Sequence, residues 1–308
     1  MEIRHLQHFI ALAEEGQFTA AARKMHIVQS GLSVTIKELE QELGSQLVNR
    51  TTRRVSLTSS GELFLEHARS SLAMLNDGIN AVRSQDGVVR GRLHLGILQS
   101  LRHYLNLPHL LDTFCSKYPE VEFAVRNLST ETIPAVRSGY LDVSFHALVG
   151  NKKWTGVKII PFTQDSLVAI CSKKHQLATG RTVRLDCLAV ERFVDLTPER
   201  GLRRLVDHVF SERNLKRDTV YEVSDVDMML HFVAEGLGLA IVPSALARSS
   251  GLPKQLHVLP ITTSHGRLPK WRIVIVTRAQ RRHVPGKTTV DLFLETLEKL
   301  QPGLTLRQ

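Results

Sequence analysis

The chain has 308 residues, of which 43% are hydrophobic and 23% are charged, and it carries a formal net charge of +10 at pH 7. Such a length and composition predict a globular protein of about two domains. No stretch stays apolar for the roughly 18 residues that a membrane helix needs, so we expect no membrane partner. The opening segment MEIRHLQHFIALAEEG carries acidic residues too early for a signal peptide, which predicts a cytoplasmic location.

The basic excess does not by itself locate a nucleic-acid surface. Residues 1–58 hold seven Lys or Arg against six Asp or Glu, whereas residues 91–308 hold thirty against twenty. Three cysteines, Cys115, Cys171 and Cys187, are spaced too widely for a CxxC site, and the 14 histidines include no HxxxH or HExxH pattern. We therefore expect buried reduced thiols, with a redox sensor as the less favoured alternative, and no metal site.

The first 58 residues predict a compact helical unit. Apolar residues recur at helical spacing up to Gly16, which ends the first helix, and Thr19 is placed to cap a second helix rich in alanine. After a turn at Ile27 and Val28, a third helix is expected to bury an apolar stripe and to stop at Gly44. The residues of that stripe are Leu32, Ile36, Leu39 and Leu43.

The opposite face of the third helix carries short polar groups instead of the usual acids and bases. At the N-terminal end of a helix such groups can bind base edges in the major groove of DNA. The acidic residues Glu38, Glu40 and Glu42 collect at the other end, away from phosphate. The candidate base-contacting residues are Gln29, Ser30, Ser33, Val34 and Lys37.

Next along the chain, two short apolar runs flank a basic turn. Leu47-Val48 and Val55-Leu57 predict two strands, and Arg50, Arg53 and Arg54 lie on the turn between them. Guanidinium groups at a hairpin tip can clamp phosphates or enter a narrow minor groove. Either element alone is more often a solvated surface, but the two in this order favour a DNA-binding helix followed by a wing.

The segment LQHFIALAEEGQFTAAARKMHIVQSGLSVTIKELEQELGSQLVNRTTRRVSLTSSGE resembles, along its whole length, the winged helix-turn-helix motif of LysR-type transcriptional regulators. Val28 and Ser30 stand where that family usually has a serine and a proline, and Val48 stands near the place of an aromatic residue. Loss of a serine cap should cost the third helix about 1 kcal/mol. The resemblance implies that residues 1–58 bind DNA, the polar helix face on bases or the adjoining backbone and the wing arginines on phosphates or the minor groove.

A fourth helix-forming region, residues 59–88, predicts a linker and dimerisation helix. Thr58 or Ser59 can start this helix, Ser59 and Glu62 match a capping box, and apolar residues then follow with heptad spacing. A helix packed on its own domain could show the same stripe, but a lone helix between two domains favours a partner helix. Two copies would place two recognition helices on an inverted repeat. The seam residues are Leu65, Ala68, Leu72, Leu75, Ile79 and Val82.

From residue 89 to the end, strand-like runs such as GRLHLGIL and WRIVIVT alternate with amphipathic helices, which predicts an α/β architecture. The family resemblance implies an effector-binding domain of two α/β lobes like those of periplasmic binding proteins. Lobe I would comprise about 91–161 and 268–308, and lobe II about 162–267, with a small effector between them.

Ligands of open α/β sheets meet the carboxyl ends of strands and the helix N-termini that follow. Hydroxyl groups at helix N-termini suit an organic anion, and GLGLAIVP lacks the spaced glycines of a dinucleotide loop, so no further cofactor is expected. Each such residue alone is more often a helix cap. The candidate effector-binding residues are Gln99, Ser100, Ser129, Thr130, Phe145, His146, Thr197, Ser224 and Asp225.

Together these features predict a sequence-specific DNA-binding transcriptional regulator controlled by a small-molecule effector. No GxSxG, Walker A or paired-carboxylate signature indicates an enzyme. The alternative is a cytoplasmic two-lobed ligand-binding protein or enzyme whose N-terminal helices only mediate assembly. Expected partners are double-stranded DNA at an inverted-repeat promoter site, the effector and further copies of the chain. By family resemblance a homotetramer is favoured over a homodimer, and RNA polymerase is a candidate partner.

Overall fold

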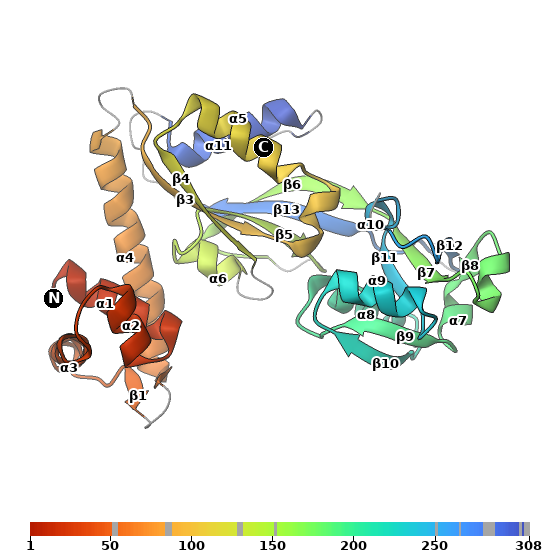
Figure 1. Cartoon of the computed structure of the whole chain (residues 1–308), viewed down its shortest axis with the longest axis horizontal. Coiled ribbons are helices and arrows are strands. Elements are labelled where there is room, and N and C mark those ends of the chain that lie inside the picture. Colours follow the sequence, from red (N-terminus) through yellow and green to blue (C-terminus); the bar gives the residue numbers. More distant parts are fainter. Residues whose placement is uncertain are drawn as a thin grey trace.

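The computed structural model describes residues 1–50, 55–83, 88–127, 132–150, 153–249, 252–264, 266–279, 287–301 and 304, without the side chains of residues 50, 77, 80, 81 and 83. It contains an N-terminal helical domain, a long helix and two α/β lobes, which follow one another along the molecule (Figure 1). None of the helices within these described residues combines the length and the apolar character needed to cross a membrane.

The N-terminal domain consists of three helices and a hairpin, followed by the long helix. Its elements are α1 (Ile3–Glu15), α2 (Phe18–Lys24), α3 (Gln29–Leu43), β1 (Val48–Arg50), β2 (Val55–Leu57) and α4 (Ser59–Arg83). Gly16 and Gly44 end α1 and α3 in the left-handed conformation, with φ of 63° and 64°, as the sequence predicts. β1 and β2 pair antiparallel, with Val48 opposite Leu57.

Two local expectations are wrong. The helix α2 begins before Thr19, with Gln17 as its N-cap, so Thr19 does not cap it. The Thr19 hydroxyl instead donates a hydrogen bond of 2.9 Å to Gln29 Oε1, at the start of α3. Leu43 is 38% exposed rather than buried, because the buried stripe of α3 ends one turn earlier, at Leu39.

The long helix α4 and the hairpin are both fixed to the helical unit. Ala68 of α4 is 1% exposed and packs in the same core as residues of α1 and α3. Glu40 Oε1 accepts hydrogen bonds from the N–H groups of Leu47 and Val48, at 2.9 and 3.2 Å. The core residues contributed by α1 and α3 are Phe9, Ala11, Leu12, Leu32, Ile36 and Leu39. The helix α3, the hairpin and the first turns of α4 therefore form one packed body.

Lobe I is built on a five-stranded sheet with the order β4-β3-β5-β13-β6. Its elements are β3 (Gly91–Ile97), the 3-10 helix η2 (Gln99–His103), α5 (Leu107–Lys117), β4 (Val121–Asn127), α6 (Thr132–Arg137), β5 (Val143–Leu148), β6 (Val157–Asp165), β13 (Trp271–Arg278) and α11 (Thr289–Leu300). β3 is parallel to β4 and β5, whereas β13 is antiparallel to β5 and β6. α5 and α11 cover one face of the sheet and α6 covers the other (Figure 1).

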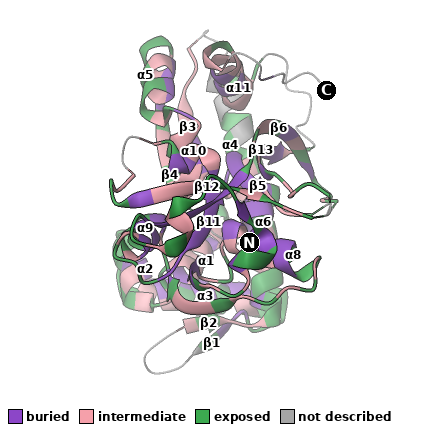
Figure 2. Ribbon diagram, turned by 90° about the vertical axis from the view of Figure 1, so that its right-hand side faces the viewer, coloured by how far each residue is buried: buried purple, intermediate pink, exposed green. Residues whose placement is uncertain are grey.

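Lobe II contains a four-stranded sheet with the order β11-β7-β12-β8 and a parallel pair, β10-β9. A bridge between Phe193 and Leu239 connects the pair to the sheet. The elements of the lobe are β7 (Leu167–Ser172), η3 (Gln176–Thr179), β8 (Val183–Arg184), α7 (Leu185–Leu188), β9 (Arg192–Leu196), α8 (Gly201–Ser211), β10 (Asp218–Val223), α9 (Val226–Ala234), β11 (Ala240–Pro243), α10 (Ser244–Ala247) and β12 (Leu256–Thr262). Figure 2 shows buried residues along strands of both lobes, such as β5 and β11.

The chain passes between the lobes twice. β6 stays in the sheet of lobe I through Asp165, and β7 begins lobe II at Leu167; the return lies between β12 and β13. The first crossing is therefore at Ser166, after the expected boundary at 161/162, because β6 remains paired with β13 up to its last residue.

The cysteines fit the expectation of buried thiols only in part. Cys171 is buried and Cys115 is partly buried, but Cys187 is exposed, and all three are free. In the part of the chain that the structure describes, no group of three or more His, Cys, Asp or Glu could hold a metal ion.

Two glycines of α4 differ in what surrounds them, which gives a matched test of how α4 packs. A Cβ atom at Gly61 would lie 2.0 Å from the carbonyl oxygen of Leu47, whereas a Cβ atom at Gly78 would meet nothing within 4 Å. We expect Gly61→Ala to lower the free energy of unfolding by about 1 to 3 kcal/mol through overpacking. Gly78→Ala should raise it by up to about 1 kcal/mol, because alanine favours a helix over glycine. Thermal unfolding followed by circular dichroism measures both, and equal effects would contradict the described contact between α4 and the wing.

Candidate DNA interface and effector cleft

The face of α3 that the sequence assigns to DNA lies at the protein surface. Gln29, Ser30, Val34 and Lys37 are exposed, and Ser33 is partly exposed. They lie within the first nine of the 15 residues of the helix, whose buried side faces α1 and α2. Val34 is 55% exposed, so its apolar side chain is free to contact a thymine methyl group. This face can therefore offer donors, acceptors and one apolar contact to a groove.

Gln29 is held in place by a residue of the preceding helix. Its side-chain oxygen accepts the hydrogen bond from Thr19, so the amide group is oriented before any ligand arrives. Val28, at the N-cap of α3, provides no side-chain cap, as the sequence predicts. The first turn of α3 therefore keeps unpaired N–H groups, which suit a phosphate oxygen.

The wing is anchored at both strands. The N–H group of Val55 donates to the carbonyl oxygen of Gly16 at 2.9 Å, so β2 is tied to the end of α1. Arg53 and Arg54 lie outside the described residues, as does the side chain of Arg50, whose backbone is the last residue of β1. The contacts of these three arginines with DNA thus remain predictions from the sequence.

Only the second half of the predicted dimerisation seam is available to a partner. Ala68 is buried in the N-terminal core and Leu65 packs against that core, so both serve their own domain, contrary to the expectation. Leu72 is partly buried. Leu75, Ile79 and Val82 are 39%, 38% and 66% exposed. The spacing did not reveal this division, because one heptad stripe continues from the core contact into the exposed turns.

A cavity of about 50 Å³ lies between the two lobes. Lobe I contributes residues that follow β3, the last residue of β4 and the first residue of β13; lobe II contributes the ends of β9 and β11, the starts of α8 and α9 and one residue of α10. The lining residues are Leu98, Gln99, Ser100, Asn127, Leu196, Arg200, Gly201, Leu202, Val226, Pro243, Leu246 and Trp271. The carboxyl ends of strands from both lobes thus converge on one small space, as expected for a ligand site in α/β sheets.

Among the residues predicted to bind an effector, Gln99 and Ser100 line this cavity. Thr197 and Asp225 lie next in sequence to lining residues, and Ser224 lies two residues before one, but none of the three lines the cavity. Asp225 caps α9 by accepting a hydrogen bond of 2.8 Å from the N–H group of Met228. Ser129 and Thr130 fall outside the described residues.

Phe145 and His146 are placed elsewhere by the structure, so their assignment to the cavity is wrong. Phe145 is 1% exposed and packs edge to face against Phe162, with ring centroids 5.1 Å apart. His146 is 8% exposed, and burial, followed by the nearby charge of Arg204, lowers its pKa to about 4. The burial of both side chains follows from the position of β5 in the middle of its sheet, where both faces of the strand are covered.

Several lining residues carry no signal that the sequence pattern could have used. Leu196, Leu202, Val226 and Leu246 look like ordinary core residues, and Trp271 is the first residue of a strand that returns from the other lobe. Only the folded topology brings Trp271 against the start of α8, where a Cβ atom at Gly201 would lie 3.5 Å from the indole ring.

Asp165 joins the lobes at the first crossing. Its carboxylate accepts hydrogen bonds from the Tyr104 hydroxyl at 3.0 Å, the Ser244 hydroxyl at 2.5 Å and the Ala245 N–H group at 2.7 Å. Burial alone would raise the pKa of Asp165, but these hydrogen bonds outweigh it and hold the pKa below its usual value. A charged Asp165 therefore connects lobe I, the crossing and the start of α10.

A second link between the lobes is exposed. Arg102 of η2 pairs with Asp227 of α9, and both side chains are about half exposed, at 54% and 51%. Exposed ion pairs contribute little to the free energy of unfolding, about 0 to 1 kcal/mol, so this one can open without a large cost.

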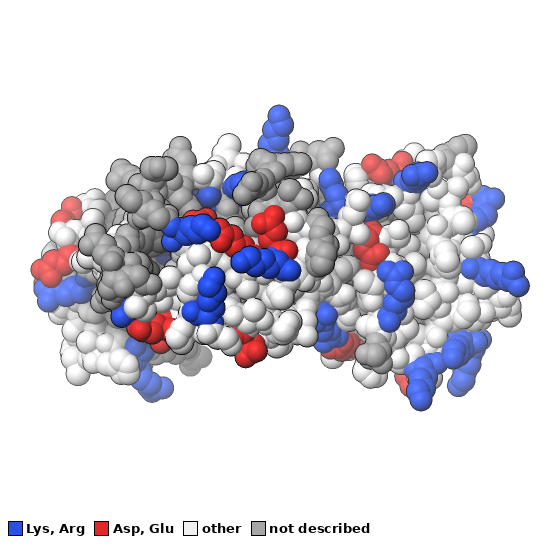
Figure 3. Space-filling model, turned by 90° about the horizontal axis from the view of Figure 1, so that it is seen from above, with Lys and Arg blue, Asp and Glu red and all other residues white. Residues whose placement is uncertain are grey.

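On the face of the molecule seen in Figure 3, basic and acidic side chains are interspersed over the described residues rather than segregated into one basic field.

Two protein-family models match this chain. A model described as a bacterial regulatory helix-turn-helix protein of the lysR family matches residues 3–62, and a LysR substrate binding domain matches residues 86–301. The chain is 31% identical to the transcriptional regulator AlsR of Bacillus subtilis over 248 residues, which are 80% of this chain and 81% of AlsR. It is 33% identical to the transcriptional regulator ShiR of Corynebacterium glutamicum over 269 residues, 85% of this chain and 88% of ShiR.

Solved structures show the same arrangement of parts. The crystal structure of CbnR, a LysR family transcriptional regulator, aligns with this chain with a TM-score of 0.65 and 24% identity. The alignment covers 97% of this chain and 99% of the CbnR chain. Full-length CbnR complexed with its target DNA gives a TM-score of 0.63 at 24% identity, over 97% of this chain and 99% of that one. Full-length BenM gives a TM-score of 0.58 at 26% identity, over 97% of this chain and 96% of its own.

The buried His146 predicts a pH dependence of stability. The unfolded chain takes up a proton near pH 6.5, but folded His146 stays neutral until about pH 4. Stability conferred by the neutral imidazole should thus fall as the pH drops from 6.5 to 4, by up to about 3 kcal/mol. Urea unfolding between pH 4.5 and 7.5 measures this loss, which should be smaller in His146→Gln. His109→Gln, at an exposed position of α5, is the control, and equal slopes in all three proteins would contradict the prediction.

Proposed function

This chain belongs to the LysR family of transcriptional regulators, and on that premise we propose that a small molecule held between lobes I and II changes how paired recognition helices meet DNA. It is a DNA-binding transcriptional regulator with an effector-binding domain. The alternative of an enzyme, or of a ligand-binding protein with assembly helices, fails because the curated relatives are transcriptional regulators. The observation that supports our proposal most is the cavity at the strand ends of both lobes.

On the DNA side, the exposed face of α3 is proposed to contact base edges. Gln29 and Ser33 would bond to bases, Val34 would meet a methyl group, and Ser30 and Lys37 would contact bases or the adjoining backbone. Arg50, Arg53 and Arg54 would hold flanking phosphates or the minor groove. Because residues 1–58 carry almost equal numbers of basic and acidic residues, binding would depend on these local contacts rather than on bulk charge.

The exposed turns of α4 are proposed to pair with the same turns of a second copy. Leu75, Ile79 and Val82 leave apolar surface that water would otherwise cover. A pair of chains would present two recognition helices to an inverted repeat. We further propose a tetramer that acts in the cytoplasm at promoters, where RNA polymerase is a candidate partner.

Contacts between α4 and lobe I give the effector a route to the DNA-binding domain. Arg137 Nε donates to Glu66 Oε1 at 2.8 Å. The guanidinium of Arg69 lies 4.3 Å from the centroid of the Tyr140 ring, and that of Arg126 lies 4.6 Å from the same centroid. Arg126 directly precedes Asn127, which lines the cavity. A ligand that moves the end of β4 would therefore act, through Arg126, on the Tyr140 ring, which contacts Arg69 of α4.

Base recognition by α3 has a direct test. We expect Gln29→Ala to lower the discrimination between the natural site and a site changed at one base pair by about 1 to 3 kcal/mol. Gln41→Ala, at an exposed position near the end of the same helix, is the matched control and should retain discrimination. Fluorescence anisotropy with DNA from upstream of the gene measures both variants at a fixed salt concentration. Unchanged discrimination in Gln29→Ala would remove this residue from the interface.

The coupling between α4 and lobe I is tested at Tyr140. Tyr140→Leu removes the aromatic ring that two guanidinium groups contact, and each lost contact should cost about 0.5 to 2 kcal/mol. Hydrogen exchange of the α4 amides should therefore become several-fold faster. Tyr140→Phe removes the hydroxyl to which Arg126 donates a hydrogen bond but keeps the ring that contacts Arg69, so α4 should exchange almost as in the natural protein. Mass spectrometry of peptides that cover residues 64–76 reports the rates. Faster exchange around residue 140 with unchanged α4 would show that lobe I does not hold this helix.

A further inference from the structure

The first residue of α3 is hydrogen-bonded to the first turn of α2. The Thr19 hydroxyl donates to Gln29 Oε1 at 2.9 Å, and both side chains are exposed. A threonine inside a helix often donates to a carbonyl group one turn earlier on its own helix, as Thr35 does to Gly31. Thr19 instead bridges two helices, beside the face of α3 that is proposed to contact base edges.

The turn between α2 and α3 fixes the positions of both residues. In this turn His26 adopts the left-handed conformation, with φ of 57°. The N–H group of Ile27 donates to the carbonyl oxygen of Ala22 at 3.0 Å. Ala22 lies in the same buried cluster as residues of α3. Because the two helices share a core and a tight turn, the Thr19 hydroxyl is held at a fixed position relative to the backbone of Gln29.

The hydrogen bond restricts a flexible side chain before DNA is bound. A free glutamine side chain samples many rotamers and loses this freedom when it binds a base. The bond from Thr19 removes part of that freedom in advance, so that less is lost on binding. Water competes for the exposed bond in the free protein, but water is excluded where a helix lies in the groove, and there the bond is stronger. Thr19 is therefore placed to act on DNA through Gln29.

The same bond decides which end of the Gln29 amide is offered to DNA. A glutamine amide has an acceptor end, the carbonyl oxygen, and a donor end, the amino group. Because Oε1 accepts from Thr19, the Nε2 amino group is the end that remains for a base. In the major groove the keto oxygens of guanine and thymine accept hydrogen bonds, whereas the amino groups of adenine and cytosine donate them.

From these contacts we infer that Thr19 is a positioning residue, which makes Gln29 a hydrogen-bond donor toward DNA and so directs it to the keto oxygen of guanine or thymine. Thr19 acts through Gln29 and makes no base contact of its own. The inference rests on the proposed function, because it requires the proposed contact between Gln29 and a base. It adds the residue that orients this contact and the kind of base edge that the contact reads.

The first test is a double-mutant cycle in the full-length chain, followed by fluorescence anisotropy at a fixed salt concentration. Discrimination is the ratio of the dissociation constants for DNA changed at one base pair and for natural upstream DNA, at the pair where Gln29→Ala loses discrimination. We expect Thr19→Val to lower this ratio about three- to tenfold, and Thr19→Ser to retain it. In the Gln29→Ala background Thr19→Val should have no further effect. An equal loss in both backgrounds would show that Thr19 acts on DNA directly and would overturn the inference.

The second test asks whether Gln29 donates or accepts. At the same base pair, one DNA carries a base analogue with hydrogen in place of the keto oxygen, and another carries an analogue with hydrogen in place of the exocyclic amino group. We expect loss of the keto oxygen to weaken binding of the natural chain several-fold more than binding of Gln29→Ala. Loss of the amino group should affect both proteins equally. A loss that depends on Gln29 only when the amino group is removed would overturn the assigned donor role.

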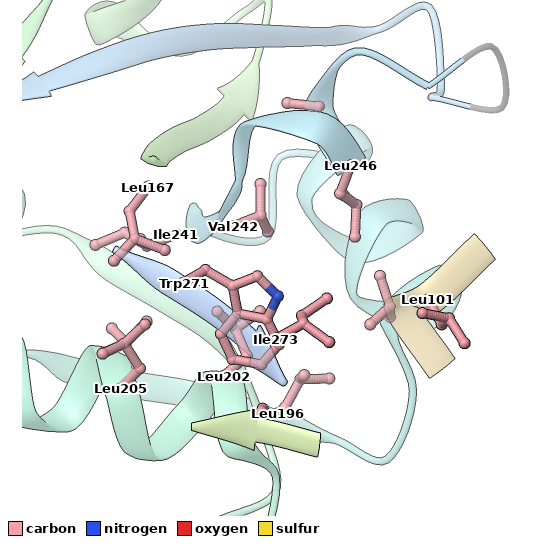
Figure 4. Close-up of a cluster of buried hydrophobic side chains, with 14 of the residues drawn as sticks. Leu101, Leu167, Leu196, Leu202, Leu205, Ile241, Val242, Leu246, Trp271 and Ile273 are labelled. Carbon is pink, nitrogen blue, oxygen red and sulfur yellow. The ribbon is translucent and has the colours of Figure 1, made fainter. Parts of the chain in front are cut away.

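A stability control separates loss of positioning from loss of fold. Figure 4 shows Ile241 in a cluster of buried apolar side chains of the effector-binding domain, and this residue is 3% exposed. Ile241→Val should lower the melting temperature by a few degrees and leave discrimination unchanged. A loss of discrimination in Ile241→Val as large as that in Thr19→Val would assign the effect to stability and overturn the inference.

The cycle also separates this inference from the proposed function on which it rests. If Gln29→Ala retains discrimination at every base pair, the proposed base contact fails, and the role of Thr19 fails with it. If Gln29→Ala loses discrimination but Thr19→Val does not, the base contact stands and the role assigned to Thr19 is wrong.

Discussion

The structure depends on one constraint, the continuity of α4. This single helix packs into the N-terminal core through Ala68, and on the same turns Glu66 and Arg69 contact lobe I. A helix that is packed on both sides cannot turn one domain without moving the other or breaking contacts. The recognition helix and the effector-binding domain are therefore mechanically linked before any ligand or DNA is present, and a ligand needs only to favour one arrangement of the lobes over another.

The lobes themselves are joined in a way that permits such a shift. The chain crosses between them twice, and the first crossing is fixed by a charged Asp165 with donors from both sides. The pair of Arg102 and Asp227 adds an exposed link that costs little to separate. A well-anchored hinge and a weak link across the lobes are what an opening and closing motion requires, and the cavity that would respond to that motion lies between them.

Local patterns in the sequence predict the N-terminal domain well, because its signals are local. Gly16 and Gly44 end helices through their own backbone preference, and the polar face of α3 is visible from its spacing. The errors come from tertiary context: Leu43 lies past the last contact of its helix, and Ala68 belongs to the core although it continues the heptad stripe. In the cavity, hydroxyl groups at helix starts correctly indicate Ser100, but the same pattern cannot indicate Trp271, which reaches the site only through the return of the chain from lobe II.

The most direct test of the account is a hydroxyl-radical footprint of the purified full chain on DNA from upstream of its own gene, at low ionic strength. If α4 presents the recognition helices in pairs, the footprint should show two protected segments about one helical turn apart, or a multiple of it, that appear together as protein is added. A single protected segment at every protein concentration, or no protection at all, would contradict the claim that the face of α3 around Gln29 lies in the grooves of DNA.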